Sequence, residues 1–233
     1  MTTIAENLHQ VRERIARACI QSGRDPQSVT LLAVSKTFAS AAVREAFSAG
    51  QAAFGENYIQ EAVEKIQALE HLHLQWHCIG PIQSNKTRLV AEHFQWAHTV
   101  DRLKIAQRLS DQRPKECAPL QVCVQVNVDA GVTKSGVAPS EALSLARAVA
   151  ALPGLRLRGF MCIPEPATNF VAACAIFAKA KALFDQCNDA GMELDTLSMG
   201  MSDDLEAAIA SGSTLVRVGR AVFGQRSYAT VAT

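Results

Sequence analysis

The first apolar positions of the chain are separated by three or four residues, which is the spacing of one helix face. They are Ile4, Leu8, Val11, Ile15 and Cys19. Gly23 and Pro26 follow, and both residue types commonly end helices. The pattern therefore predicts a helix that precedes the first strand.

After this helix, short apolar runs alternate with stretches of helical period. The predicted strands are 29–35, 52–55, 74–80, 96–100, 120–128, 155–162, 196–199 and 214–218. The predicted helices are 40–50 with Ser40 as its cap, 58–69, 85–93, 102–112, one that begins at Pro139, 170–187 and 203–210. No linker interrupts this alternation, so the chain is predicted to be α/β, a single (β/α)₈ TIM barrel over residues 1–233 with an extra N-terminal helix.

The composition excludes several functional classes. Hydrophobic residues make up 48% and charged residues 19%, and the 23 Lys and Arg are dispersed among 22 Asp and Glu, so we expect no nucleic-acid partner. No run approaches the ~20 apolar residues of a membrane span, and charges interrupt the N-terminal stretch where a secretory signal would be apolar. The seven cysteines form no C-x-x-C pair, so neither disulfides nor a zinc site is indicated. We expect a cytoplasmic protein without a membrane partner.

Lys36 ends the apolar run LLAVSKT of residues 31–37. An ammonium group is strongly hydrated, and one held against apolar neighbours tends to lose its proton and become nucleophilic. Lys36 is therefore either the first solvated residue after a strand or a nucleophile with a chemical role.

The loops after the last two predicted strands suggest a phosphate site. SMGMSDD and VRVGRAVFG place Ser202, Gly219 and Arg220 near helix starts, where backbone N–H groups lack partners and favour an anion. Phosphates often bind at this place in such barrels. The alternative is that Ser202 is an N-cap and Gly219 a turn residue. Two carboxylates in the first turn, Asp203 and Asp204, oppose an anion, and Arg220 would offset them.

Arg217 lies on an otherwise apolar strand, where a guanidinium needs a partner. It either pairs with a structural carboxylate or meets an aromatic nitrogen of a ligand. His71 and His73 have the spacing of metal ligands but precede the third strand's apolar centre, so we expect them on the surface. The other residues expected at strand ends are Glu56, Asn57, His77, Asn127, Lys134, Met161, Pro164 and Ser198.

No G-x-S-x-G elbow or evident triad accompanies the serines and cysteines. A lysine nucleophile, a phosphate site and a cationic strand residue remain. Together they fit a cofactor with both an aldehyde and a phosphate, namely pyridoxal 5′-phosphate (PLP), held as a Schiff base.

Six segments carry a family resemblance. In order they are AVSKT, FGENYIQEA, WHCIGPIQSNKTR, GFMCIPEP, LSMGMSDDLEAAI and VRVGRAVFG. Together they closely resemble the PLP homeostasis protein family, also called the proline synthase co-transcribed family, over nearly the whole chain.

The resemblance implies a fold-type III barrel like the N-terminal domain of alanine racemase, with Lys36 forming the internal aldimine to PLP. It further implies that Arg217 faces the pyridine nitrogen and that Ser202, Gly219 and Arg220 hold the phosphate. A cation at the ring nitrogen disfavours ring protonation and weakens the ring as an electron sink. By the same likeness the pocket-lining positions are Asn57, His77 and Met161.

The racemases complete their active site with a tyrosine from a second domain, for which the chain has no room after FGQRSY; Tyr228 is too isolated to replace that base. We therefore expect a monomeric carrier that buffers PLP and delivers it to PLP-dependent apo-enzymes, without turnover. The alternative is a fold-type III amino-acid racemase or decarboxylase that uses Lys36 as its base. A Schiff-base aldolase that uses Lys36 without PLP is a third option.

Overall fold

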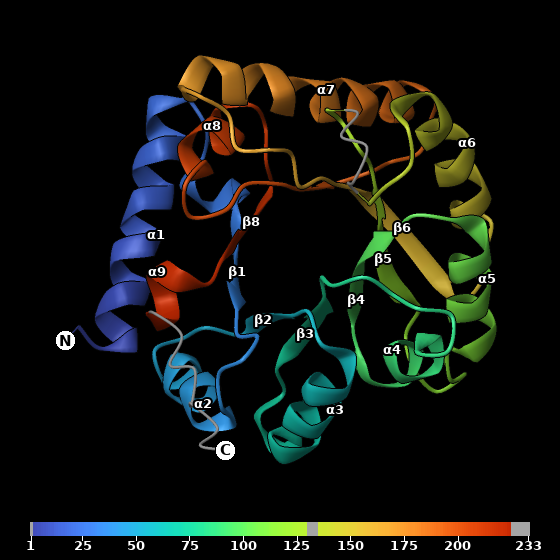
Figure 1. Ribbon diagram of the computed structural model, residues 1–233, viewed down its shortest axis with the longest axis horizontal. Coiled ribbons are helices and arrows are strands. Elements are labelled where there is room, and N and C mark those ends of the chain that lie inside the picture. Colours follow the sequence, from blue (N-terminus) through green and yellow to red (C-terminus); the bar gives the residue numbers. More distant parts are fainter. Residues whose placement is uncertain (1, 130–134, 225–233) are drawn as a thin grey trace, which may run out of the picture.

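Eight parallel strands form a closed barrel within residues 2–129 and 135–224, the part of the chain that the computed structural model describes (Figure 1). Strands adjacent in sequence are adjacent in the barrel, and the last pairs with the first. This confirms the predicted (β/α)₈ fold. The strands are β1 (Thr30–Val34), β2 (Ala53–Glu56), β3 (Gln75–Cys78), β4 (Trp96–Val100), β5 (Leu120–Gln125), β6 (Leu155–Met161), β7 (Thr196–Ser198) and β8 (Leu215–Val218).

Helices surround the barrel, and the extra helix α1 lies beside α8 and α9 (Figure 1). Within the described ranges, no helix is both long and apolar enough to cross a membrane. The α-helices are α1 (Ile4–Gln21), α2 (Ser40–Ser48), α3 (Ile59–Ala68), α4 (Thr87–His93), α5 (Leu103–Gln112), α6 (Pro139–Ala150), α7 (Phe170–Asp189), α8 (Leu205–Ala210) and α9 (Arg220–Phe223), and the short 3₁₀ helices are η1 (Pro26–Ser28) and η2 (Glu70–Leu72).

The starts of α3, α4, α5 and α8 lie one or two residues after the predicted ones, and the N-caps of α2 and α8 differ from those that the sequence suggested. Ala39 is the N-cap residue of α2, and Ser40 is already its first helical residue, so Ser40 is not the cap. Helix α8 begins at Leu205 instead of residue 203 because Asp204 takes the N-cap position and its carboxylate accepts the Met201 N–H at 2.6 Å. The interpretation of Ser202 as an N-cap is therefore wrong.

Most of the cysteines pack as small apolar side chains, as the sequence predicts. Burial raises the pKa of the Cys78, Cys123 and Cys162 thiols to about 12, so each stays protonated at neutral pH. The cysteines of the chain all lie in the described ranges, and none forms a disulfide. Cys78, Cys123 and Cys162 therefore offer no reactive thiolate.

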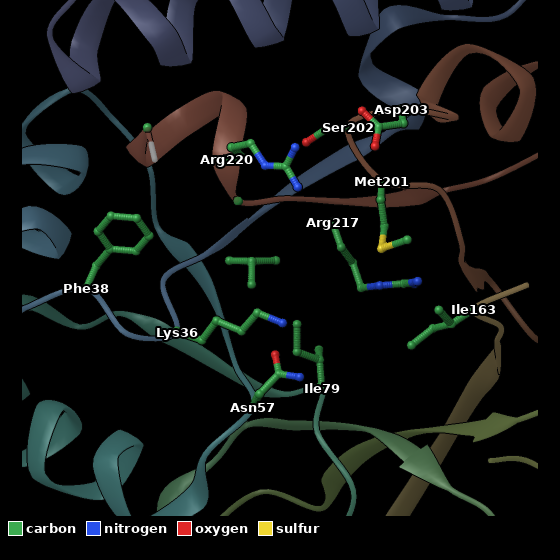
Figure 2. Close-up of a pocket in the computed structure, with 13 residues that line it drawn as sticks. Lys36, Phe38, Asn57, Ile79, Ile163, Met201, Ser202, Asp203, Arg217 and Arg220 are labelled. Atoms are coloured by element: carbon green, nitrogen blue, oxygen red, sulfur yellow. The ribbon is translucent and has the colours of Figure 1, made fainter. Parts of the chain in front are cut away.

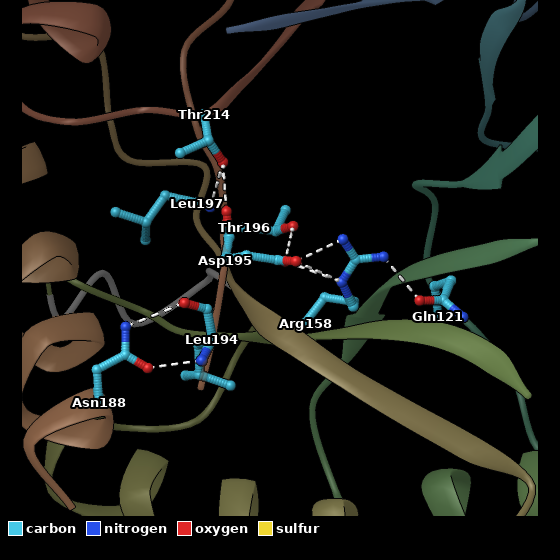
Figure 3. Close-up of polar contacts among 8 residues, drawn as sticks. All are labelled: Gln121, Arg158, Asn188, Leu194, Asp195, Thr196, Leu197 and Thr214. Atoms are coloured by element: carbon cyan, nitrogen blue, oxygen red, sulfur yellow. Dashed lines mark hydrogen bonds and ion pairs between the residues drawn. The ribbon is translucent and has the colours of Figure 1, made fainter. Parts of the chain in front are cut away.

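A polar cluster lies at the amino-terminal ends of the strands (Figure 3). Arg158 of β6 donates to both carboxylate oxygens of Asp195 and to Gln121, and its guanidinium lies 4.7 Å from the centroid of the Trp96 ring. Thr214 donates to the Asp195 carbonyl and accepts the Leu197 N–H. These contacts link the four strands β5, β6, β7 and β8 at the amino-terminal end of the barrel.

Some residues singled out in the sequence lie away from the barrel mouth. His71 and His73 are exposed and precede β3, as predicted. Lys134 and Tyr228 lie outside the described residues.

Candidate cofactor site

A cavity of about 550 Å³ opens at the carboxyl ends of the strands. Six of the eight residues predicted for a cofactor line it: Lys36, Asn57, Ser202, Arg217, Gly219 and Arg220. Figure 2 shows the side chains of Lys36, Asn57, Ser202, Arg217 and Arg220 around a common space. The remaining lining residues are Val34, Phe38, Ile79, Ile163, Met201, Asp203 and Gly224.

Lys36 follows β1 and is half-buried at the cavity wall. Its neighbour Thr37 has a φ of 68°, in the left-handed region that a β-branched residue rarely adopts. The Glu61 carboxylate accepts the Thr37 N–H at 3.0 Å and so stabilises this turn. The chain therefore leaves the barrel sharply just after Lys36, while the amine remains in the cavity.

A buried charge pair fixes the residue before Lys36. The Lys65 amine donates to the Glu56 carboxylate at 2.6 Å and to the Ser35 carbonyl at 3.0 Å, while the Ser35 hydroxyl donates to the same Glu56 oxygen at 2.6 Å. Burial raises the pKa of Glu56, and the neighbouring Lys65 opposes that rise. The loop that carries Lys36 is thus anchored to α3 and β2 by groups with no access to solvent.

Asn57 contributes an unsatisfied polar atom to the cavity wall. Its side-chain oxygen is buried and accepts no hydrogen bond within the described part of the chain. The backbone of Asn57 packs directly against Gly80, where a Cβ atom would lie 2.1 Å from the Asn57 carbonyl oxygen. Only glycine at position 80 permits this contact, which holds the loop after β2 in place.

Arg217 brings a cation to the cavity from inside the barrel. Its side chain is 4% exposed, and it donates to the Ser198 carbonyl at 2.6 Å, the Ser198 hydroxyl at 2.9 Å and the Cys162 carbonyl at 2.9 Å. Burial lowers the pKa of Arg217, but a guanidinium stays protonated in proteins. No carboxylate in the described ranges forms an ion pair with it, so the structural-carboxylate interpretation of Arg217 is wrong.

The opposite side of the cavity combines small and cationic residues. Figure 2 shows the Arg220 guanidinium facing the Ser202 hydroxyl. Arg220 is the first residue of α9, so its N–H has no acceptor within that helix. Of the two acidic residues nearby, the Asp204 carboxylate accepts the Met201 N–H, and Asp203 lies at the exposed edge of the cavity.

His77 and Met161 do not line the cavity, in contrast to the prediction. Both are 1% exposed, and His77 lies within β3 and Met161 within β6. Their side chains therefore pack inside the barrel, below the loops that form the cavity. The His77 ring stacks on Trp96 with centroids 5.1 Å apart, and Met161 packs in a cluster with Trp96 and Cys123. We therefore do not assign either side chain a direct contact with a cofactor in this cavity.

Sequence reasoning missed the apolar lining and the anchor beneath Lys36. Ile79 lies near the end of the predicted strand 74–80 and Ile163 directly follows the predicted strand 155–162, so both could have been found by their position alone. Lys65 carries a clearer signal, because it follows Ile59 and Ala62 at intervals of three on the buried face of α3. A lysine on such a face needs a buried anionic partner.

We predict that Lys65→Met lowers the free energy of unfolding by about 3–5 kcal/mol at pH 8, because Glu56 is left buried without its cation. The pKa of Glu56 then lies further above its unfolded value, so the folded state binds the extra proton and stability increases as the pH falls through the raised pKa. Urea denaturation at pH 8 and pH 5 measures both effects. As a control, the double variant Glu56→Gln/Lys65→Met should recover stability at pH 8 and lose the pH dependence. Wild-type stability of Lys65→Met at pH 8 would contradict the role of this pair.

Comparisons with known proteins agree with this geometry. Residues 2–227 match the family described as "Alanine racemase, N-terminal domain". The chain is 60% identical, over 98% of both chains, to the pyridoxal phosphate homeostasis protein of Pseudomonas aeruginosa.

Solved structures of other proteins are also similar to this chain. PipY of Synechococcus elongatus, in a structure with PLP bound, is similar with a TM-score of 0.82 and 36% identity, covering 95% of this chain and 100% of that one. Alanine racemase from Corynebacterium glutamicum, at 16% identity and a TM-score of 0.70 over 98% of this chain and 62% of that one, shares the fold alone. The chain therefore belongs to the pyridoxal phosphate homeostasis protein family, within the larger family of the alanine racemase N-terminal domain.

Proposed function

We propose that this protein binds PLP in the cavity at the barrel mouth, buffers it, and delivers it to PLP-dependent apo-enzymes in the cytoplasm as a monomer. One observation carries the proposal: a half-buried amine, a buried cation and a polar end with a second cation line one cavity. The relatives add support, since one is named for PLP homeostasis and PipY has been solved with PLP bound.

The residues present fit this cofactor. The buried Asn57 oxygen without a partner is an acceptor that a ligand can satisfy. When bound, PLP supplies an aldehyde that condenses with a primary amine with loss of water, and a ring that can accept electrons. Lys36 would provide the amine, and Ser202, Gly219 and Arg220 would hold the phosphate.

The positive charge of Arg217 favours a carrier of PLP over an enzyme with broad amino-acid chemistry. We place its guanidinium at the ring nitrogen, where a fixed positive charge disfavours protonation. An unprotonated ring accepts electrons weakly, so substrate carbanions would gain little stabilisation. The described residues thus favour retention of the cofactor over broad amino-acid chemistry.

We predict that Lys36→Ala abolishes covalent binding of PLP because it removes the only amine that we assign to the cofactor. Wild-type protein incubated with PLP should show a visible absorbance band that borohydride fixes onto the peptide containing Lys36. The exposed Lys104→Ala variant should behave as wild type. Adduct formation at another lysine in wild-type protein would contradict the assignment, and a protein that stays colourless with added PLP would favour an aldolase that uses Lys36 alone.

The phosphate end makes a second prediction. Because Ser202 and Arg220 would contact only the phosphate, Ser202→Ala and Arg220→Ala should each weaken PLP binding about tenfold and leave the affinity for pyridoxal, which lacks the phosphate, unchanged. Fluorescence titration with both compounds measures the ratio. An equal loss for the two compounds would place these side chains elsewhere than at the phosphate.

A turnover assay separates the carrier from a fold-type III racemase or decarboxylase, which would use Lys36 as its base. On incubation with single amino acids, the carrier exchanges its bound PLP at most once per protein molecule. Chiral analysis and carbon dioxide release should therefore show no steady product. Product that accumulates beyond one equivalent of protein would support the enzyme.

A further inference from the structure

A chain of buried polar side chains leads from Arg217 into the barrel interior. The Ser198 hydroxyl lies 2.9 Å from the Arg217 guanidinium and 2.8 Å from Nδ1 of His98, and Nε2 of His98 lies 2.8 Å from Nδ1 of His77. All four residues are at most 4% exposed. They belong to β8, β7, β4 and β3, so the chain connects four strands across the inside of the barrel.

The hydrogen-bonding capacities of these groups give the chain one direction. A guanidinium only donates, so the Ser198 oxygen accepts from Arg217. The hydroxyl hydrogen of Ser198 then has one acceptor within reach among the described residues, which is Nδ1 of His98. In this direction His98 carries its proton on Nε2 and donates to Nδ1 of His77, which places the proton of His77 on its own Nε2, a buried atom without a hydrogen-bond partner among the described residues.

The two imidazoles lie between the Arg217 cation and the Trp96 ring, and the Arg158 that covers this ring is already paired with Asp195. Arg217 is at the cavity end, and at the other end Arg158 covers Trp96, the ring on which His77 stacks. Burial lowers the pKa of His77 to about 3. Burial, the neighbouring His77 ring and the Arg217 cation together hold the pKa of His98 well below its usual range. The rings are thus neutral at physiological pH, as the directed chain requires.

We propose that Ser198 and His98 are positioning residues for Arg217, and that His77 fixes the tautomer of His98 that makes this possible. Ser198 accepts from the guanidinium through both its carbonyl and its hydroxyl, and the hydroxyl can do so in this orientation because a neutral His98 accepts its hydrogen. His77, which does not reach the cavity, acts on the cofactor site through this chain. The expected effect on PLP binding rests on the proposed function, but the hydrogen-bond chain from Arg217 to His77 does not.

The first test uses the wild-type protein without cofactor, labelled with ¹⁵N at histidine. His98 and His77 should both appear as neutral Nε2–H tautomers at pH 7.5, and a scalar coupling between Nε2 of His98 and Nδ1 of His77 should report the N–H···N hydrogen bond. A proton on Nδ1 of His98, or a charged ring in either residue, would overturn the proposal.

The second test compares two buried serines, Ser198 at the end of β7 and Ser213 in the segment before β8. Ser198→Ala removes the hydroxyl between Arg217 and His98, whereas Ser213→Ala removes an equally buried hydroxyl that donates only to backbone carbonyls. We expect Ser198→Ala to shift the His98 ring nitrogens, to change the absorbance maximum of bound PLP and to weaken PLP binding about tenfold. Ser213→Ala should leave all three unchanged, even if it lowers thermal stability.

The outcomes separate the two proposals. If Ser198→Ala binds PLP with wild-type affinity and absorbance, Ser198 does not position Arg217, and the inference fails although PLP binding stands. If wild-type protein takes up no PLP, the proposed function fails. The tautomers of His98 and His77 still decide whether the hydrogen-bond chain exists.

Discussion

The pairing of β8 with β1 is the constraint on which the cavity depends. Its register places Arg217 beside Leu32 and Val218 beside Ala33, so the strand that carries the cation ends next to the strand that leads to Lys36. Gly219 then comes so close to β1 that a Cβ atom there would lie 3.2 Å from the Val34 carbonyl oxygen. Residues from the two ends of the sequence meet at the cavity because the barrel closes.

The two buried cations near the cavity are stabilised in different ways. Lys65 is neutralised by Glu56, so its charge serves to hold the loop before Lys36. Arg217 is surrounded by carbonyl oxygens and a hydroxyl, and a neutral histidine lies behind that hydroxyl. Because these partners carry no negative charge, the positive potential of Arg217 persists at the cavity wall. A ligand that presents a neutral acceptor or an anion is favoured there.

The fold could be predicted from the sequence because the strand and helix periods are clear and each strand is short and apolar. The start of α8 could not, since Asp204 and not Ser202 takes its N-cap position, whereas α6 and α7 begin at Pro139 and Phe170 as predicted. Lys36 and Arg217 were found because each interrupts an apolar run. The chain through Ser198 and His98 could not be found, because it depends on which side chains of β3, β4, β7 and β8 meet inside the barrel, and a histidine within an apolar strand gives no sign of its partners.

The central claim is that one cavity places an amine, a cation and a phosphate site around PLP. A crystal structure of the protein soaked with PLP tests it most directly. The account predicts continuous density from the cofactor to the Lys36 amine, the ring nitrogen within hydrogen-bond distance of Arg217, and the phosphate beside Ser202, Gly219 and Arg220. PLP bound outside this cavity, or in it with the phosphate against Arg217, would contradict the account.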